Sequence, residues 1–171
     1  MNINDFESSE LLITAVDSLS ELHAVLQSTE PNIILWDSDE GVDSYFHLKF
    51  LKIRSSIGLC TSNQGQFSGF KKIGQKILVY SDQKIVVIRN NFKLSWKARV
   101  DGTIFEIFVH NGKVIVVNEI GVNCFSIDDG FKLWSIYSDL IVGHNVDGDD
   151  ITLKTEGGSI HYSLKNGEPI T

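Results

Sequence analysis

The chain has 171 residues, of which 42% are hydrophobic, and this is enough apolar side chain for one ordinary folded core. Its two prolines and 14 glycines exclude a collagen-like or proline-rich chain, and its longest aliphatic runs, such as Val114–Val117, are far too short to cross a bilayer as a helix. The acidic start of the chain is unlike the basic start of an export signal and its two cysteines suit a reducing compartment, so we expect a cytoplasmic protein.

The formal net charge of −7 is distributed in three blocks. Residues 1–48 contain ten acidic residues and no lysine or arginine, and residues 49–100 contain eleven basic residues against one aspartate. Residues 101–171 contain eleven acidic residues against four lysines. Such asymmetry can steer binding to a charged partner. The alternative, which the sequence leaves open, is that the acidic first block neutralises the basic second block within the fold.

The first predicted elements are a strand, a helix and a second strand. Leu11–Ala15 is apolar and typical of a strand. Ser18 and Glu21 form a capping box, in which hydroxyl and carboxylate satisfy the first donors of a helix, and apolar residues follow at helical spacing. Asn32–Trp36 predicts the next strand. We expect residues 1–31 to form a capping unit that covers an exposed end of the β region that follows.

An acidic segment lies directly after this second strand. Four carboxylates within seven residues, beside an aromatic side chain, form the kind of surface that a cationic partner recognises by electrostatic steering and a few buried contacts. A solvated hairpin tip is the alternative. The candidate partner-binding residues are Trp36, Asp37, Asp39, Glu40 and Asp43.

A repeat of 37 residues organises the second half of the chain. Lys76–Tyr80, Lys113–Val117 and Asp150–Lys154 follow one another at this spacing, and a second apolar run and a turn come after each. Each repeat reads as four short strands, which in the second repeat are Thr103–His110, Lys113–Glu119, Val122–Ile127 and Lys132–Tyr137.

These small sheets must stack on one another. A four-stranded antiparallel sheet of this size has an apolar face that it cannot bury alone. We therefore expect Trp96 and Trp134 to be core residues at equivalent positions of successive sheets. Asn111-Gly112 predicts the tight turn of the first hairpin in the second repeat.

The second repeat resembles a known family. Asp128, Gly130, Lys132 and Trp134 stand close to the Asp-x-x-Gly-Lys-x-x-Trp turn of quinoprotein-type (PQQ-like) β-propellers, and the resemblance covers residues 68–171. A closed propeller needs at least four sheets, and this stretch contains about three. None of the family's quinone-binding or catalytic residues is matched, so we expect no cofactor.

The expected architecture is therefore mostly β, with a small α/β unit at residues 1–31. Residues 32–171 would form an incomplete β-propeller-like stack of about three to four antiparallel sheets, within a single domain. We expect an earlier, irregular sheet whose strands are Asn32–Trp36, Ser44–Leu51 and, as a weaker third, Ile57–Thr61.

No pattern of catalytic or metal-binding residues is convincing. Residues 145–156 place oxygen ligands at some positions of a calcium loop, but Asp150 stands where the loop needs glycine. The five histidines show no metal-ligand spacing and the two cysteines are far apart, so we predict neither an enzyme nor a metal site.

A small, acidic protein without catalytic residues is similar in profile to the immunity proteins of bacterial contact-dependent growth inhibition toxins. This resemblance implies a basic partner, a toxin nuclease domain, whose active site the protein occludes. A repeat-type scaffold or adaptor is the first alternative. Binding of single-stranded nucleic acid is the second, with Phe67, Phe70, Tyr80, Phe92 and Trp96 stacking on bases among the lysines, although a pI near 5.1 opposes it.

Overall fold

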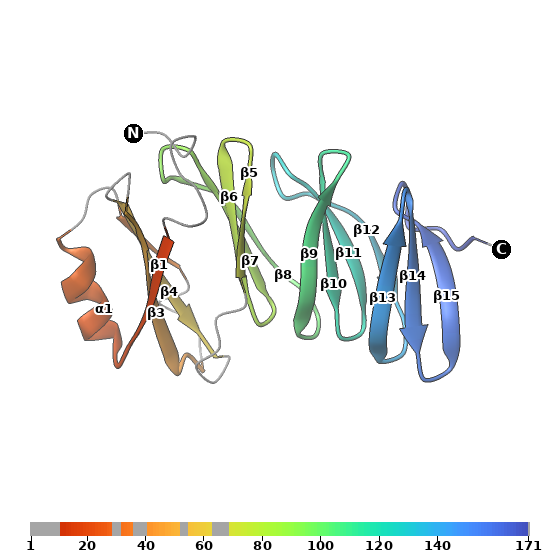
Figure 1. Cartoon of the computed structure of the whole chain (residues 1–171), viewed down its shortest axis with the longest axis horizontal. Coiled ribbons are helices and arrows are strands. Elements are labelled where there is room, and N and C mark those ends of the chain that lie inside the picture. Colours follow the sequence, from red (N-terminus) through yellow and green to blue (C-terminus); the bar gives the residue numbers. More distant parts are fainter. Residues whose placement is uncertain (1–10, 29–31, 36–40, 52–54, 63–68, 171) are drawn as a thin grey trace. The chain divides into compact units, whose positions relative to one another are not determined.

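The computed structural model describes residues 11–28, 32–35, 41–51, 55–62 and 69–170 (Figure 1). These residues form one helix and four sheets, and the helix is too short to span a membrane. The elements are β1 (Leu11–Val16), α1 (Leu19–Leu26), β2 (Asn32–Leu35), β3 (Ser44–Phe50), β4 (Ser55–Thr61), β5 (Gly69–Ile73), β6 (Lys76–Ser81), β7 (Lys84–Arg89), β8 (Leu94–Arg99), β9 (Ile104–His110), β10 (Lys113–Asn118), β11 (Gly121–Ser126), β12 (Lys132–Tyr137), β13 (Ile141–Asp147), β14 (Asp150–Thr155) and β15 (Gly158–Ser163).

The chain divides into two compact units, which we call unit 1 (Met1–Lys97) and unit 2 (Ala98–Thr171). Unit 1 contains sheet A, with strand order β1-β3-β4-β2, and sheet B, with order β5-β6-β7-β8, whose last strand crosses the boundary. Unit 2 contains sheet C, with order β12-β11-β10-β9, and sheet D, with order β13-β14-β15. Within these sheets β2 and β4 run parallel, and the other strand pairs for which a register is defined are antiparallel.

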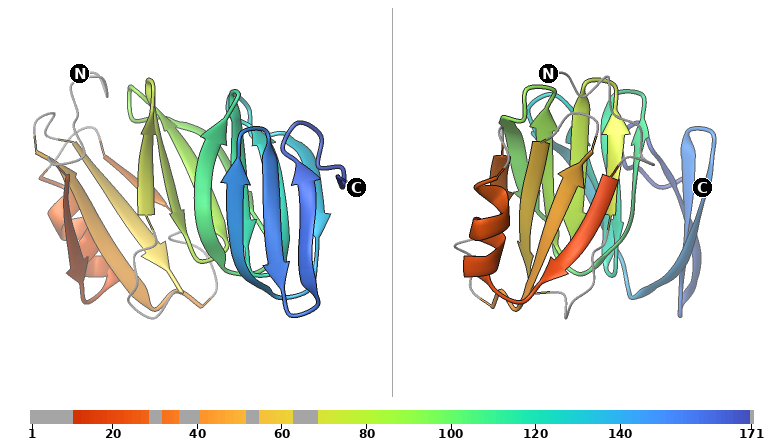
Figure 2. Two further views of the ribbon diagram at one scale, coloured as in Figure 1. Left: turned by 45° about the vertical axis from the view of Figure 1, so that its right-hand side comes forward. Right: turned by 60° about the vertical axis from the view of Figure 1, so that its left-hand side comes forward.

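Helix α1 covers one face of sheet A (Figures 1 and 2). Its buried residues Leu22 and Leu26 pack with Cys60, and the close approach depends on Gly58. A Cβ atom at Gly58 would lie 2.8 Å from Cδ1 of Leu26. The predicted strand, helix and strand are all present, but β1 and β2 occupy opposite edges of sheet A, on either side of β3 and β4.

The start of α1 follows the predicted cap with one difference. The Ser18 hydroxyl accepts a hydrogen bond from the Glu21 N–H at 3.2 Å, as expected for an N-cap. The Glu21 carboxylate accepts from the N–H of Asp17 at 2.8 Å, one residue before the cap residue itself. The capping box is therefore confirmed, except that the Glu21 carboxylate accepts from the N–H of Asp17 and not from that of Ser18.

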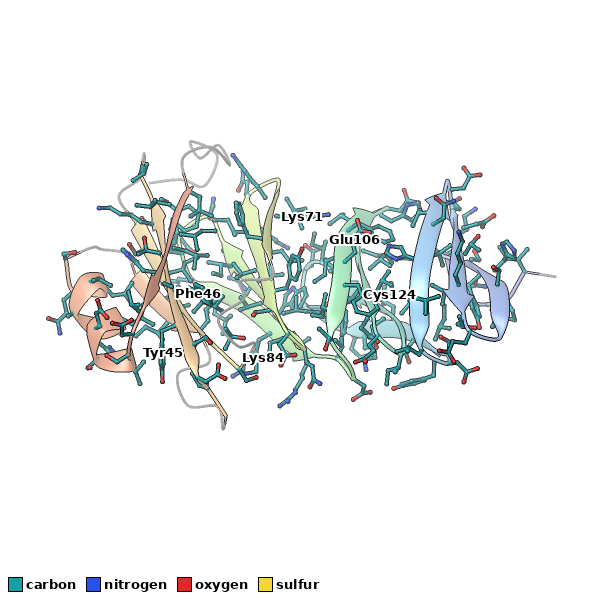
Figure 3. All side chains as sticks on the ribbon, turned by 60° about the horizontal axis from the view of Figure 1, so that its bottom comes forward. Tyr45, Phe46, Lys71, Lys84, Glu106 and Cys124 are labelled. Atoms are coloured by element: carbon teal, nitrogen blue, oxygen red, sulfur yellow. The ribbon has the colours of Figure 1, made fainter. Side chains whose placement is uncertain are left out.

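The other face of sheet A packs against sheet B. The side chains of β3 alternate between buried and half-buried, as expected for a strand with two different faces. Phe46 belongs to the core shared with sheet B, whereas its neighbour Tyr45 packs with α1 (Figure 3). The shared core contains Leu35, Phe46, Leu48, Phe50, Ile57, Leu59, Ile77, Val79, Val86, Ile88 and Phe92.

Unit 2 repeats this arrangement with sheets C and D, which lie face to face (Figure 2). The four strands predicted for the second repeat are confirmed as β9–β12, to within one residue at their ends. Asn111 and Gly112 have φ values of 48° and 73°, which are typical of the predicted hairpin turn. The core between the sheets contains Ile115, Val117, Val122, Cys124, Ile136, Ile141, Ile151, Leu153 and Leu164.

The third repeat forms three strands and only the beginning of a fourth. After β15 the chain makes one isolated bridge, between Tyr162 and Pro169. On the face of sheet D away from sheet C the side chains are polar, and Thr152 and His161 are hydrogen-bonded at 3.0 Å. Because this face is polar, it requires no further sheet to cover it.

The two tryptophans have the predicted structural role. Trp96, on β8, is 6% exposed, and Trp134, on β12, packs half-buried against the core of unit 2. They occupy the fourth strands of sheets B and C, as the repeat predicts.

Candidate functional site

The predicted acidic site lies mostly outside the described residues. Trp36, Asp37, Asp39 and Glu40 belong to that part of the chain, and only Asp43 is described. Asp43 is exposed, its N–H donates to the carbonyl of Thr61 at 3.1 Å, and its carboxylate accepts from the Ser44 hydroxyl at 2.7 Å. Asp43 is therefore held at the end of β4.

A second carboxylate lies at this end of unit 1. The Thr61 and Ser81 hydroxyls are hydrogen-bonded at 2.9 Å between sheets A and B, and both residues are fully buried. Beside them the Ser62 hydroxyl donates to the carboxylate of Asp82 at 3.2 Å. Asp82 is the one acid of the basic block, and no pattern in the sequence connects it with Asp43.

The two units carry very different charges. The acidic first block and nearly all of the basic second block belong to unit 1, whose eleven acidic and ten basic residues give a formal charge of −1. Unit 2 has eleven acidic and five basic residues, a formal charge of −6. The net negative charge of the protein is thus almost entirely in unit 2, although the densest run of acids in the sequence lies in unit 1.

One end of unit 2, which we call the hairpin end, is formed by residues 110–113, 147–150 and 164–167. There Asp149 is paired on both oxygens, with the Lys165 ammonium at 2.7 Å and with Nε2 of His110 at 2.8 Å. The hydrogen bond from Lys165, followed by that from His110, lowers the pKa of Asp149. An ionised carboxylate only accepts hydrogen bonds, so Nε2 of His110 is the protonated nitrogen and donates to it. The charge of Asp149 is therefore compensated by its two partners.

The opposite end of unit 2, which we call the crossover end, is formed by residues 100–103, 119–120, 138–141 and 156–157. Backbone hydrogen bonds tie its loops together: the Glu119 N–H donates to Thr103 at 2.9 Å, and the Ser138 N–H donates to Ile120 at 3.1 Å. The Ile141 N–H also donates to Glu119 at 2.9 Å. These bonds hold the loops in fixed positions.

The crossover end combines unpaired carboxylates with exposed apolar side chains. None of its four acids forms an ion pair within the described part of the chain, and the Asp101 carboxylate only accepts a hydrogen bond from the Tyr137 hydroxyl at 3.3 Å. Ile120, Tyr137 and Leu140 are 36%, 63% and 46% exposed. The four acids are Asp101, Glu119, Asp139 and Glu156.

Two groups with possible chemistry are closed to substrates. Nε2 of His47 lies 2.9 Å from the hydroxyl of Ser56, and such a histidine–serine pair is used in nucleophilic catalysis. Burial, and to a smaller extent the positive charge of Lys49, lowers the pKa of His47. Ser56 has no exposed surface, however, so a substrate cannot reach it. Cys124 is also fully buried, and burial raises its pKa to about 11, so this thiol is not a nucleophile near neutral pH.

A second histidine–carboxylate pair lies between the two sheets of unit 2. Glu106, on β9, lies 2.7 Å from Nε2 of His144, on β13 (Figure 3 labels Glu106). This pair links the edge strands of sheets C and D. The described residues contain no cluster of three or more side chains that would hold a metal ion.

The aromatic residues considered for base stacking are mostly in the core. Phe92 and Trp96 are 3% and 6% exposed, and Phe70 packs against the core of unit 1. Phe67 lies outside the described residues. Stacking on bases requires an open ring face, which the two buried rings do not offer.

Comparison with known proteins identifies a fold and no family. No protein-family model and no curated protein matches the chain. Among solved structures, the computationally designed Ika8 protein aligns with a TM-score of 0.53 and 11% identity over 78% of this chain and 46% of its own. BamB from Moraxella catarrhalis aligns with a TM-score of 0.51 and 13% identity over 75% of this chain and 44% of its own.

These similarities confirm the predicted fold class. BamB has a PQQ-like β-propeller fold, and the present chain is mostly β, with one short helix and four propeller-like sheets in its described part. The chain spans less than half the length of either structure. At such low identity the likeness concerns the fold alone.

Proposed function

We propose that this protein is a non-enzymatic acidic binding protein that neutralises a basic partner. The observation that carries the proposal is the crossover end of unit 2, where four carboxylates that form no ion pair with a described residue share one end of the sheets with exposed Ile120, Tyr137 and Leu140. It belongs to the unit with a formal charge of −6.

The two kinds of side chain would serve different steps of binding. Unpaired carboxylates attract a cationic protein over roughly the Debye length, about 10 Å, and raise the association rate. Aromatic and aliphatic side chains at the centre of the contact, Tyr137 above all, then slow dissociation once water is excluded. Because backbone hydrogen bonds already hold the loops, little conformational entropy is lost on binding.

For the partner we propose a bacterial toxin nuclease, with this chain as its cytoplasmic immunity protein. A nuclease cleft binds a phosphate backbone through lysine and arginine side chains. An acidic protein that occupies such a cleft excludes nucleic acid from the active site without chemistry of its own. The expected mechanism is therefore stoichiometric occlusion.

The acidic segment at Trp36, Asp37, Asp39, Glu40 and Asp43 remains the second candidate contact in this proposal. It belongs to unit 1, where basic residues nearly balance the acids. On charge alone it would contribute less long-range attraction than the crossover end.

The test first asks whether a nuclease domain is encoded beside the gene of this chain, which the proposal expects, and then titrates that domain with the purified full chain. Occlusion predicts that nuclease activity falls linearly and ends at one equivalent, and that raising the salt concentration slows association. A filter assay of the chain alone on single-stranded RNA and DNA is the control for direct nucleic-acid binding. Undiminished nuclease activity at excess chain would refute the proposal.

A further inference from the structure

Tyr137 presents an open aromatic ring at the crossover end of unit 2. It is the last residue of β12, which is an edge strand of sheet C. Its cross-strand neighbour on β11 is Gly121, which has no side chain to cover the ring. Tyr137 is 63% exposed, whereas Ile136 beside it is 6% exposed. The ring therefore has surface available to a ligand.

A hydrogen bond joins this ring to a carboxylate. The Tyr137 hydroxyl donates to the carboxylate of Asp101 at 3.3 Å. The Asp101 carboxylate forms no ion pair with any residue that the structure describes. An ionised carboxylate has about four lone-pair sites, so the bond from the tyrosine leaves most of them open. An aromatic ring and a hydrogen-bond acceptor are thus held side by side.

The loop that carries Asp101 is fixed by close packing of its backbone. Gly102 has a φ of 84°, and a Cβ atom there would lie 3.2 Å from Cβ of Glu119 and 3.3 Å from Cγ1 of Ile120. The carbonyl of Thr103 accepts a hydrogen bond from the Glu119 N–H at 2.9 Å. Because this loop is already held in place, a ligand that binds to Asp101 orders little of the chain.

We propose that Tyr137 and Asp101 bind one arginine side chain of the basic partner. This inference rests on the proposed function and names the chemical group that the crossover end recognises. A guanidinium group is planar, so it can stack on the face of the tyrosine ring. The same group donates two parallel hydrogen bonds to a carboxylate. One arginine side chain can therefore use both parts of the site at once.

Lysine matches the same two groups less well. Its ammonium is a compact and strongly hydrated point charge, which neither stacks on a ring nor bonds a carboxylate through a planar fork. A cation over an exposed aromatic ring contributes about two- to fivefold in affinity, and arginine makes this contact more often than lysine. We therefore expect the site to bind arginine at least about threefold more tightly than lysine.

An NMR titration of the full chain with two blocked tripeptides, Gly-Arg-Gly and Gly-Lys-Gly, tests the site directly. The two peptides carry the same charge, so a difference between them reports on the guanidinium group. We expect the arginine peptide to shift the ring signals of Tyr137 and the backbone signals of Asp101, with the threefold preference over lysine. Tyr137→Leu and Asp101→Asn should each abolish that preference.

Phe131→Leu is the matched control for the ring. Phe131 is 69% exposed in the same unit, and its side chain has no bonded carboxylate among the described residues. This variant should keep the preference for arginine. Circular dichroism and urea unfolding establish that each variant is folded. Inhibition of the nuclease domain is measured with the same variants, and Tyr137→Leu should weaken it about fivefold or more, whereas Phe131→Leu should not.

The two measurements separate this inference from the proposed function. Equal binding of the two peptides at Tyr137 and Asp101, or shifts confined to other residues, would overturn the arginine site and leave the proposed function standing. Undiminished inhibition by folded Tyr137→Leu would also overturn the inference. A wild-type chain that prefers the arginine peptide but does not inhibit the nuclease domain would overturn the proposed function and leave the arginine site standing.

Discussion

The ring of Phe92 packs edge-on against the ring of Phe50, with centroids 5.4 Å apart, although the Phe92 backbone is left-handed at φ 59°. The corresponding turns of the other two repeats have glycine in this conformation, Gly130 at 73° and Gly167 at 74°. A left-handed backbone costs a residue with a Cβ roughly 1–2 kcal/mol. Burial of the Phe92 ring, which is 3% exposed, offsets that cost.

This relationship predicts an unusual order of stability. Phe92→Ala and Phe92→Gly should each lower the free energy of unfolding by about 3–5 kcal/mol, because both leave a cavity beside Phe50. Glycine relieves the left-handed strain, so Phe92→Gly should be about 1 kcal/mol more stable than Phe92→Ala. Urea unfolding measures both. The usual order, alanine above glycine, would show that the backbone at this turn is not strained.

Gly167 should be the least replaceable of the turn glycines in unit 2. A Cβ there would lie 2.9 Å from the Trp134 ring, in addition to the strain of a φ of 74°. We expect Gly167→Ala to lower the free energy of unfolding by about 2–3 kcal/mol. The control is Gly112→Ala, because Gly112 has a φ of 73° but a Cβ added there would meet no atom within 4 Å. This control should lower the free energy of unfolding by about 1 kcal/mol. Urea unfolding followed by tryptophan fluorescence compares them. Equal losses would mean that Trp134 moves aside freely.

The Asp149 pairs should make acid stability depend on one carboxylate. The hydrogen bond from Lys165 and, second in size, the one from His110 lower the pKa of Asp149 below its ordinary value of 3.8. The carboxyl of Asp149 therefore binds a proton more readily in the unfolded chain than in the folded one. The stabilisation of the fold by ionised Asp149 is present above pH 3.8 and is lost as the pH falls through the lower folded pKa. Asp149→Asn should unfold at lower temperature than wild type at pH 6, and the difference should disappear in stronger acid. A difference that persists unchanged there would contradict the pairing.

Charge reversal separates the two candidate contact regions. Four lysines at Asp101, Glu119, Asp139 and Glu156 should slow association with the nuclease domain by about tenfold or more at low ionic strength, and less at high salt. The matched set at Asp37, Asp39, Glu40 and Asp43 changes the charge equally and should have a smaller effect. Stopped-flow association rates measure both. A larger effect of the second set would place the contact on unit 1.

Much of the fold could be predicted from the sequence because its signals are local. The Asn111-Gly112 turn and the Ser18 cap depend on residues a few positions apart, and the 37-residue repeat is the recurrence of such short patterns. Each was found where expected. The turn of the first repeat was harder to interpret. No local rule places a phenylalanine in a left-handed conformation, because its compensation is a contact with Phe50, on a different sheet.

The sequence by itself determined the strand lengths, the turns and the alternation of apolar residues, because these follow from the conformational preferences of neighbouring residues. Only the tertiary structure decided which charges remain unpaired. The acidic segment is conspicuous in the sequence, yet it shares a unit with the basic block, whereas the acids of the crossover end are scattered between Asp101 and Glu156. They converge because strands that run alternately up and down bring every second loop to the same end of the sheets.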